Sequence, residues 1–465
     1  MAQDGAMPVD ASFLRSLLVP PPIDPDDQAQ QFPDSILLDP FGFISPHKND
    51  TTAEGKTRDG HHSIFVTFWP AKPPRISYFT VHCPGLPNHA FGDYPKIVTS
   101  EANLVLLRVP ICRRGVHQHP HNSHYFVYKV GKNGPSLHLI PSDSDPDPRF
   151  TDSETVLLPR PSSNMYFIAK LGDRVPNGEH EQFNIHLFDS KKNTWDTKFM
   201  YASKDFNYVN SSKVITIGGP CGSVGWVDLW HGILICDVLQ DSRYLRYIPL
   251  PSPSVSKVFN GPPTYVRDIV VVQRMHTFDR VDPESGYCVS DGWEAATSVL
   301  DPNKVHQNWK DDCTINISEI TVTDPTHVQM LPNLLDGEDD TWPIQEGVND
   351  AGIILKRLCA GCPSLSLQHN DVVYITNKFE FLDNKAWVIA VDMRHNALND
   401  VAYYDVSGRH MSYGSAFLES GISKHLTVWS AARNRDGHNA AETRKNGMAS
   451  TGKKKVVGSI GKKKT

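Results

Sequence analysis

The chain has 465 residues, a small formal net charge of −6 and 39% hydrophobic residues. It contains no run of 18 or more apolar residues, so we expect no membrane span, and its charge gives no overall attraction to nucleic acid. The 35 prolines and 31 glycines divide the apolar runs into short pieces, which favours many short strands and turns over long helices.

The N-terminal segment does not have the pattern of a secretory signal. It carries two acids early, and its only apolar run, Phe13–Val19, contains an arginine. We therefore expect a protein of the cytoplasm or nucleus, whose eight cysteines are reduced thiols rather than a disulfide framework. Residues 1–34 are rich in Pro, Asp and Gln and lack periodicity, so they are predicted to be disordered apart from one helical turn near Ser12–Leu18.

Ordered structure is predicted from about residue 35. The stretches His62–Trp69 and Arg75–His82 are rich in β-branched and aromatic residues, and a Pro-containing turn between them indicates a hairpin. Asn103–Pro110 is a near-continuous apolar run of the length of a buried strand. Further strands are expected at 125–130, 136–140, 155–158, 164–170, 183–188, 195–201 and 213–217.

The central stretch 222–251 contains three predicted strands in a row. Its sequence is GSVGWVDLWHGILICDVLQDSRYLRYIPLP, with strands at Gly225–Trp230, Ile233–Asp237 and Tyr244–Leu250 and a turn signal in each gap. Such a meander has the form of one propeller blade. The remaining strands are predicted at 266–273, 293–300, 314–322, 372–376, 387–391, 401–404 and 412–418.

A weak repeat relates these meanders. A strand ends on an acid before a turn at Asp189, Asp237, Asp301 and Asp392. An Asp at this position can accept hydrogen bonds from the backbone of the following turn, so we interpret these acids as turn residues rather than as paired catalytic carboxylates. The fold class predicted from the repeat is all-β. We expect a β-propeller of about six blades, each a three- to four-stranded antiparallel meander, with disordered termini. The propeller would span 35–426 and close by pairing its last strand with an N-terminal one.

The composition changes after residue 426. Residues 427–465 have almost no pattern that could form a core, and they end in lysine triplets at 453–455 and 462–464. We predict a disordered basic tail. The triplets are typical either of a plain solvated tail or of a nuclear localisation signal or nucleic-acid contact.

The stretch GWVDLWHGILICDVLQDSRYLRYIPLP resembles the plant family of unknown function numbered 1618, which is expanded in grasses. Supporting stretches are ILLDPFGFI, ISYFTVHCPG, IVTSEANLVLLRVPI and VRDIVVVQ, and the resemblance covers roughly residues 33–426. It implies no chemistry and no catalytic residues, because the family has none assigned. Its meanders are similar to those of kelch-like and F-box-associated propellers, and Gly218-Gly219 followed by Trp226 loosely fits the kelch pattern. No F-box helix pattern precedes them.

A histidine-rich segment is the one weak candidate for metal binding. His117, His119 and His121, with His124 nearby, alternate along an extended stretch, and imidazole is a common ligand of zinc, copper and nickel. Pro120 interrupts the stretch, however, and no Cys or carboxylate lies close to it in sequence. A solvated polar loop is therefore favoured, and no metal or other cofactor is predicted.

Two further motifs have simple structural explanations. Cys359 and Cys362 form a lone CxxC, whereas a structural zinc site needs a second pair of ligands, and Pro363 disfavours the helix that a redox CxxC requires. We interpret the two cysteines as small turn residues. The Gly-rich stretch 219–225 leads into a strand and lacks the P-loop lysine, so close backbone approach is favoured over phosphate binding.

The residues most suited to a binding site lie in the central stretch. Asp228 and His231 are close together there, beside Trp226 and Trp230. Strand alternation leaves their convergence open, and blade packing also requires large flat side chains. Core packing is therefore favoured for the five central tryptophans, which are Trp195, Trp226, Trp230, Trp293 and Trp309.

The functional prediction is a non-enzymatic scaffold that binds other proteins as a monomer. The long loops 45–61, 111–124 and 323–349 would supply specificity on a rigid ring. The alternative is a hydrolase or metal-dependent enzyme in the propeller channel, and at least three titratable side chains meeting in one pocket would favour it. Nucleic-acid binding rests on the basic tail alone.

Overall fold

The computed structural model describes most of the chain between residues 16 and 426. The described ranges are 16–22, 32–112, 123–141, 152–160, 163–177, 180–203, 206–241, 243–251, 262–265, 267–270, 274–279, 293–299, 309–322, 324–332, 354–355, 358–378, 383–405 and 417–426. Within these ranges, no helix has the length and apolar character needed to cross a membrane. The predicted basic tail at 427–465 lies outside them.

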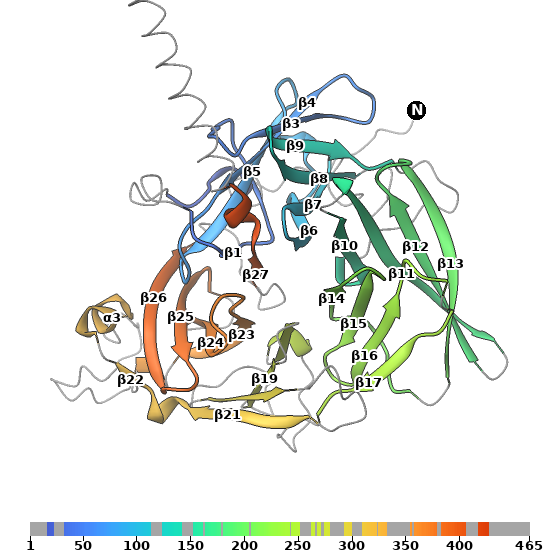
Figure 1. Ribbon diagram of the computed structural model, residues 1–465. Helices are drawn as coiled ribbons and strands as arrows, with labels where there is room; N and C mark the ends of the chain where they lie inside the picture. Colours follow the sequence, from blue (N-terminus) through green and yellow to red (C-terminus); the bar gives the residue numbers. More distant parts are fainter. Residues whose placement is uncertain are drawn as a thin grey trace, which may run out of the picture.

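The described strands form six small sheets that follow one another around a ring (Figure 1). Four of the sheets have four strands in chain order, one has five strands and one has six. In the four-stranded sheets each strand pairs antiparallel with the next along the chain. The expected all-β propeller is therefore confirmed.

Three sheets come from the first half of the chain. The first contains β27 (Leu418–Ser420), β1 (Ile36–Leu38), β5 (Ile76–His82), β4 (Ser63–Trp69) and β3 (Ala53–Lys56), with β2 (Phe43–Ile44) beside β5. The second contains β6 (Lys96–Glu101), β7 (Leu104–Val109), β8 (His124–Gly131) and β9 (Gly134–Leu139). The third contains β10 (Thr155–Arg160), β11 (Met165–Asn177), β12 (His180–Asp189) and β13 (Thr194–Ser203).

The other three sheets complete the ring. The fourth contains β14 (Lys213–Gly218), β15 (Ser223–Asp228), β16 (Gly232–Asp237) and β17 (Arg246–Pro249). The fifth contains β18 (Arg267–Val270), β19 (Arg274–Asp279), β20 (Glu294–Val299) and β21 (Lys310–Asn316). The sixth contains β23 (Cys359–Leu365), β24 (Val372–Lys378), β25 (Lys385–Asp392), β26 (Ala397–Asp405) and β22 (Thr321–Val322), with helix α3 (Pro325–Met330) nearby.

The ring closes through the two ends of the folded chain, as expected. The last strand, β27, pairs antiparallel with β1, so that Ile36 lies opposite Ser420. The Ser420 hydroxyl also lies 2.6 Å from that of Ser100 on β6, in the next sheet. The strand predicted at 412–418 is therefore displaced: β27 begins only at Leu418, and 412–416 lie outside the described residues.

Acids end the third strand of several sheets and organise the turn that follows. The carboxylate of Asp189 accepts hydrogen bonds from two turn amides, those of Lys191 and Lys192, and Asp392 does the same for Arg394 and His395. Two of the predicted turn acids thus have the expected role. Asp237 instead accepts from the hydroxyl of Ser223 on the neighbouring strand, and Asp301 lies outside the described residues.

The hydrophobic core is divided into clusters, several of which lie between neighbouring sheets. One cluster joins Leu106 of the second sheet to Ile168 of the third, and another joins Ile235 of the fourth sheet to Ile269 of the fifth. Because every sheet has a neighbour on each side, both of its faces bury apolar side chains. All five central tryptophans pack in or against such clusters, as the core interpretation predicts.

Three details differ from the sequence-based expectations. Cys359 and Cys362 lie on strand β23 rather than in a turn; Cys362 has a φ of 51° at a register shift, which is how the strand accommodates Pro363. The predicted strand 314–322 is interrupted by a 3₁₀ turn, because the side chain of Asn316 caps it by accepting from the Ser318 amide.

The third detail concerns the N-terminal segment. Residues 16–18 are helical, within the turn expected at Ser12–Leu18, but Leu17 is fully buried in a core cluster with residues of the first two sheets, so this turn packs against the propeller.

Candidate functional site

The β15–β16 hairpin brings the four predicted binding residues close together. Strand β15 ends at Asp228, and the amide of His231 donates to the Asp228 carbonyl 3.1 Å away, which closes a tight turn before β16. Gly232 follows because a Cβ there would lie 2.3 Å from the Tyr247 ring. The tyrosine hydroxyl donates to the His231 carbonyl, at 3.0 Å.

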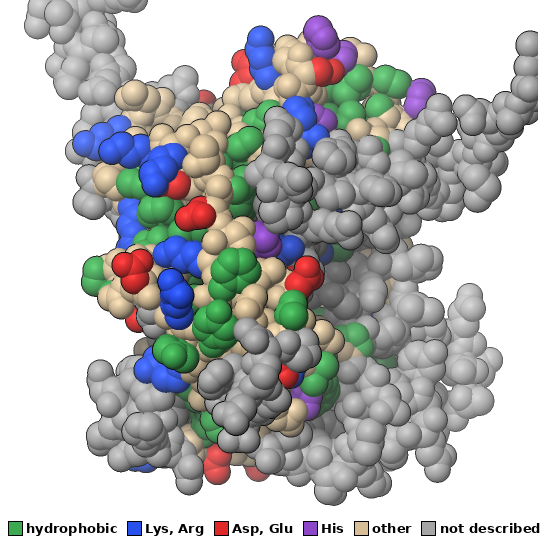
Figure 2. Space-filling view, turned by 90° about the vertical axis from the view of Figure 1, so that its right-hand side faces the viewer, with side chains coloured by type: hydrophobic (Ala, Val, Ile, Leu, Met, Phe, Trp, Pro, Cys, Tyr) green, Lys and Arg blue, Asp and Glu red, His purple; other side chains and the backbone are tan. Residues whose placement is uncertain are grey.

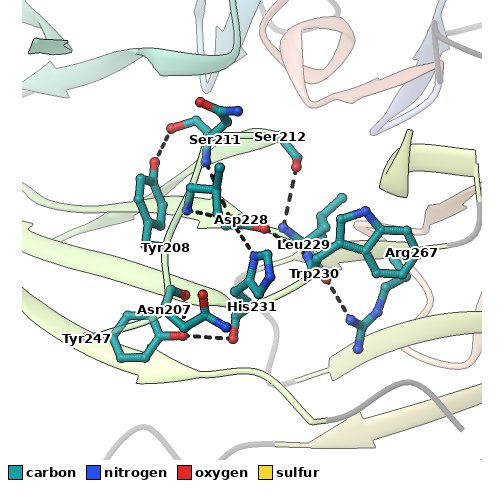
Figure 3. A network of polar contacts seen from close by, with 12 residues as sticks. Asn207, Tyr208, Ser211, Ser212, Asp228, Leu229, Trp230, His231, Tyr247 and Arg267 are labelled. Atoms are coloured by element: carbon teal, nitrogen blue, oxygen red, sulfur yellow. Dashed lines mark hydrogen bonds and ion pairs between the residues drawn. The ribbon is translucent and has the colours of Figure 1, made fainter. Parts of the chain in front are cut away.

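The carboxylate of Asp228 is buried and fully engaged (Figure 3). Its Oδ2 accepts from the Val209 amide at 2.9 Å, from the Asn210 amide at 3.4 Å and from Nδ1 of His231 at 2.8 Å. Its Oδ1 accepts from the Trp230 amide at 3.0 Å. Four donors reach the group from two segments, so Asp228 fastens the segment before β14 to the hairpin turn.

His231 is partly exposed, with 31% of its side chain accessible to solvent. Because its Nδ1 donates to Asp228, the imidazole is held in one orientation. An Asp–His pair of this kind can orient a general base, but here the same carboxylate also holds three backbone amides. The geometry therefore accounts for the pair as part of the turn.

The two tryptophans beside this pair lie at sheet junctions. Trp226 is fully buried, and its indole N–H donates to the Glu154 carbonyl at 2.9 Å, in the segment that leads into β10. Trp230 lies with its ring centre 5.9 Å from the guanidinium carbon of Arg267 on β18, and that arginine donates to the Leu229 carbonyl at 2.7 Å. All four predicted residues thus belong to one junction between the third, fourth and fifth sheets, and a binding role for them stays a prediction.

The histidine-rich segment contributes little to the described structure. His117, His119 and His121 lie outside the described residues. His124 begins β8 and stacks on Phe126. Burial and the positive charge of Arg58 lower the pKa of His124 to about 4, so its imidazole is neutral at physiological pH.

A second candidate site lies at the centre of the ring, and none of the four predicted binding residues lines it. The innermost strand of every sheet borders one cavity of about 690 Å³. These strands are β6, β10, β14, β18, β23 and β27. The charged residues on its wall are Lys96, Glu101, Lys213, Arg267, Asp268 and Glu419.

An ion pair crosses between two of these inner strands. Nζ of Lys213 on β14 lies 2.5 Å from Oδ1 of Asp268 on β18. The other oxygen of Asp268 accepts from the Leu365 amide on β23, at 3.2 Å. Asp268 therefore ties three inner strands together and has its charge balanced by Lys213.

Glu419 and Glu101 are the less balanced acids of the cavity. The Oε1 atom of Glu419 accepts from the Ser35 hydroxyl at 3.3 Å, whereas Oε2 is buried with no partner in hydrogen-bond geometry among the described residues. Burial raises the pKa of Glu419 to about 8, although the Leu367 amide and Ser35 partly offset this effect. Burial likewise raises the pKa of Glu101, with a smaller opposing effect from the Thr216 hydroxyl.

A family model described as "Protein of unknown function (DUF1618)" matches residues 226–374. This match begins inside the central stretch and supports the family resemblance seen in the sequence. No curated protein matches the chain.

Among solved structures, a mutant of Trypanosoma rangeli sialidase displaying trans-sialidase activity aligns at a TM-score of 0.28 with 10% identity. The alignment covers 88% of this chain and 62% of the sialidase chain, so the chain spans less than two thirds of that enzyme's length. A likeness at this TM-score supports no inference about shared fold or activity.

Proposed function

We propose that the protein is a non-enzymatic protein-binding module and that its partner docks on the outer part of the third sheet. The single observation that carries the proposal is an exposed aromatic and aliphatic surface on strands that extend past their neighbours. Strand β10 pairs with β11 only as far as Lys170, but β11, β12 and β13 continue together to Asn177, His180 and Ser203. The ends of β11, β12 and β13 therefore extend past the last residue pair between β10 and β11.

Five residues form this surface, which we call the overhang patch. Val175, Gln182 and Tyr201 lie opposite one another on β11, β12 and β13, and Tyr244 bridges to Tyr201 from the segment before β17. Phe199 lies two residues before Tyr201 and therefore on the same face. Val175 is 47% exposed, Phe199 52% and Tyr244 70%. Large apolar side chains gathered on a surface are typical of protein-interaction sites.

The surroundings of the patch indicate the chemistry of the partner. Arg243 and Arg246 flank Tyr244 and are exposed. On the face that carries β13, hydrophobic side chains lie among lysines and arginines, with some acidic side chains between them (Figure 2). Tyrosine and arginine are the residues most enriched at binding hot spots. We therefore expect a partner segment with an apolar anchor flanked by acidic residues.

A capture experiment tests this proposal. The immobilised full chain would be incubated with cell lysate beside a Phe199→Ser/Tyr244→Ser double variant and a Tyr403→Ser control. Tyr403 is 48% exposed on β26 and far from the overhang patch in the ring. Proteins retained by the wild type and the control, but lost from the double variant, are the expected result. Identical capture by all three chains would overturn the proposal.

The alternative function is hydrolysis in the central cavity, and one observation favours it. Lys213, Asp268 and Glu419 come from three different sheets and border the same cavity, with Glu101 on a fourth. A glutamic acid that is protonated at neutral pH can act as a general acid. Turnover of a model ester or glycoside that is lost in Glu419→Gln and retained in Phe199→Ser would support this function, and equal turnover in both variants would refute it.

We further propose that the module acts as a monomer in the cytoplasm or nucleus, in a plant, and that its fold is related to kelch-like propellers. Any nucleic-acid contact would come from the tail at 427–465. Deleting that tail should then remove salt-dependent binding to nucleic acid without affecting protein capture.

A further inference from the structure

A buried lysine and two buried cysteines lie together at one end of the sixth sheet. Lys378 is the last residue of β24 and is 1% exposed, and Cys359, the first residue of β23, is 8% exposed. The register of the two antiparallel strands places Cys359 directly opposite Lys378. Residues opposite each other in such a pair have Cβ atoms about 5 Å apart on one face of the sheet, so the lysine side chain starts beside the thiol.

Both thiols are close enough to the lysine amine to act on it by charge. Burial lowers the pKa of Lys378 to about 8, and the negative charges that Cys362, Asp383 and Cys359 can carry oppose this effect. A fraction of the amine is therefore uncharged near neutral pH, with a lone pair on Nζ. The cluster thus places a nucleophilic nitrogen beside oxidisable sulfur atoms.

The positions of the two cysteines on β23 disfavour a disulfide between them. Pairing with β24 continues without a break from Cys359 to Gly361, so this part of the strand is extended. Three steps of extended strand cover about 10 Å, whereas a disulfide needs Cα atoms within about 7 Å of each other. The register shift after Gly361 shortens the span only in part. Lys378, across the ladder from Cys359, is therefore the better placed partner for an oxidised thiol.

We propose that this cluster is a reversible oxidation site, in which Lys378 reacts with the sulfenic acid that a peroxide forms on Cys359 or Cys362. In the first step the O–O bond of hydrogen peroxide breaks, one oxygen atom is transferred to the thiol sulfur, and one water is released. The sulfur is thereby oxidised by two electrons. In the second step the Nζ lone pair attacks this sulfur, the S–O bond breaks, and the hydroxide that leaves takes a proton from the amine to form a second water. The product is a sulfenamide, with a covalent S–N bond between β23 and β24.

The S–N bond would protect the site from irreversible oxidation. A sulfenic acid that finds no partner can be oxidised further to a sulfinic acid, which thiols do not reduce. A thiol that attacks the sulfenamide sulfur releases the lysine amine and leaves a mixed disulfide, and a second thiol then restores the cysteine. Because β23 and β24 are already paired, the bond can form and break within the folded sheet. This inference concerns a modification site and does not rest on the protein-binding proposal.

Cys83 provides a control within the same chain. It is also buried, with 3% of its surface exposed. Burial and the negative charge of Asp59 raise the pKa of this thiol to about 11. Its charged neighbour is thus a carboxylate rather than an amine, so oxidation at Cys83 should give no link to a lysine.

Peptide mapping of the oxidised full chain tests the proposal. The folded protein would be treated with hydrogen peroxide at about 1 mM, its remaining thiols alkylated, and the chain digested with chymotrypsin for mass spectrometry. The expected product is a linked peptide pair that contains Lys378 and Cys359 or Cys362. Its mass should be about 2 Da below the sum of the two peptides, and dithiothreitol should separate them.

Variants of the cluster assign the link. Lys378→Met should abolish it and increase the sulfinic acid at the two cysteines by about threefold or more, because the sulfenic acid then has no amine to react with. Cys359→Ser and Cys362→Ser show which thiol takes part, and the double variant should give no link. Methionine has a similar length and removes a buried charge, so Lys378→Met is expected to fold, as thermal melts would check.

Three results would overturn the proposal. They are a Cys359–Cys362 disulfide as the main product, oxidation or persistence of both thiols without any link to Lys378, and equal amounts of sulfinic acid in Lys378→Met and the wild type. The first two are read from the wild-type chain alone, so they stand even if a variant fails to fold.

Discussion

Asp228 and Glu419 are both acids held inside the propeller, but their surroundings differ. Four donors from two segments surround the Asp228 carboxylate at the β15–β16 turn. Glu419 has the Ser35 hydroxyl and the Leu367 amide beside it, and its Oε2 is buried without a partner in hydrogen-bond geometry among the described residues. A buried carboxylate whose bonds are filled by its own chain holds the fold together, whereas one with bonding capacity left over can take a ligand.

The largest effect is expected from Asp228→Ala. The substitution removes a buried carboxylate, leaves the amides of Val209, Asn210 and Trp230 and the His231 imidazole without their acceptor, and frees the hairpin turn. We expect a loss of about 3 kcal/mol in the free energy of unfolding, measured by urea denaturation. The matched control is Asp189→Ala, where two solvent-exposed hydrogen bonds to turn amides are lost and the cost should be about 1 kcal/mol. Equal losses in the two variants would show that Asp228 is an ordinary turn acid.

An intermediate effect is expected from Asp268→Ala, since this acid belongs to the cavity but is fully paired. Its removal leaves Lys213 without its partner and the Leu365 amide without its acceptor. We expect a loss of about 2 kcal/mol, reduced because one third of the Lys213 side chain is exposed to solvent.

A double variant with Lys213→Met separates the ion pair from the amide contact. The second substitution should restore part of the lost stability, because it removes the unpaired charge. The contrary outcome is a stability loss of the double variant that equals the sum of the losses in Asp268→Ala and Lys213→Met. In that case Lys213 and Asp268 are not energetically coupled, and the two side chains do not balance each other's charge.

The contrast between the two acids also shows how far the sequence could predict this fold. Turn acids such as Asp189 were identified because the strand, the acid and the turn are adjacent in sequence, and the same local reading located Asp228 with His231. The ring closure was predicted because a propeller needs its last strand to pair with an early one. The short edge strand β6 was missed, since Lys96–Glu101 has few apolar residues and no clear alternation.

The cavity could not be predicted from local patterns. Glu101, Lys213, Asp268 and Glu419 come from four inner strands, and they meet only because each sheet places one edge strand at the centre. That placement depends on sheet order and on the closure by β27, which no single stretch encodes. The only signal in the sequence was a charged residue within a short strand, as at Asp268 in β18, and surface edge strands carry the same signal.

The smallest effect, with the opposite sign, is expected from Glu419→Gln in the absence of ligand. The folded-state pKa of Glu419 is about 8, above its ordinary value of 4.5, so the folded protein must either keep its proton or bury a charge. Below about pH 4.5 the group is protonated in both the folded and unfolded states and costs nothing. As the pH rises from about 4.5 to about 8, Glu419 ionises in the unfolded chain but stays protonated in the folded protein, so the wild type loses folding stability. A neutral glutamine has no such loss. The variant should therefore be more stable than the wild type by about 1–2 kcal/mol at pH 8 and equal to it at pH 4.5, as measured by urea denaturation across this range. A glutamine variant that is less stable at every pH would mean that Glu419, like Asp228, is held by its own chain, and the distinction between the two acids would fail.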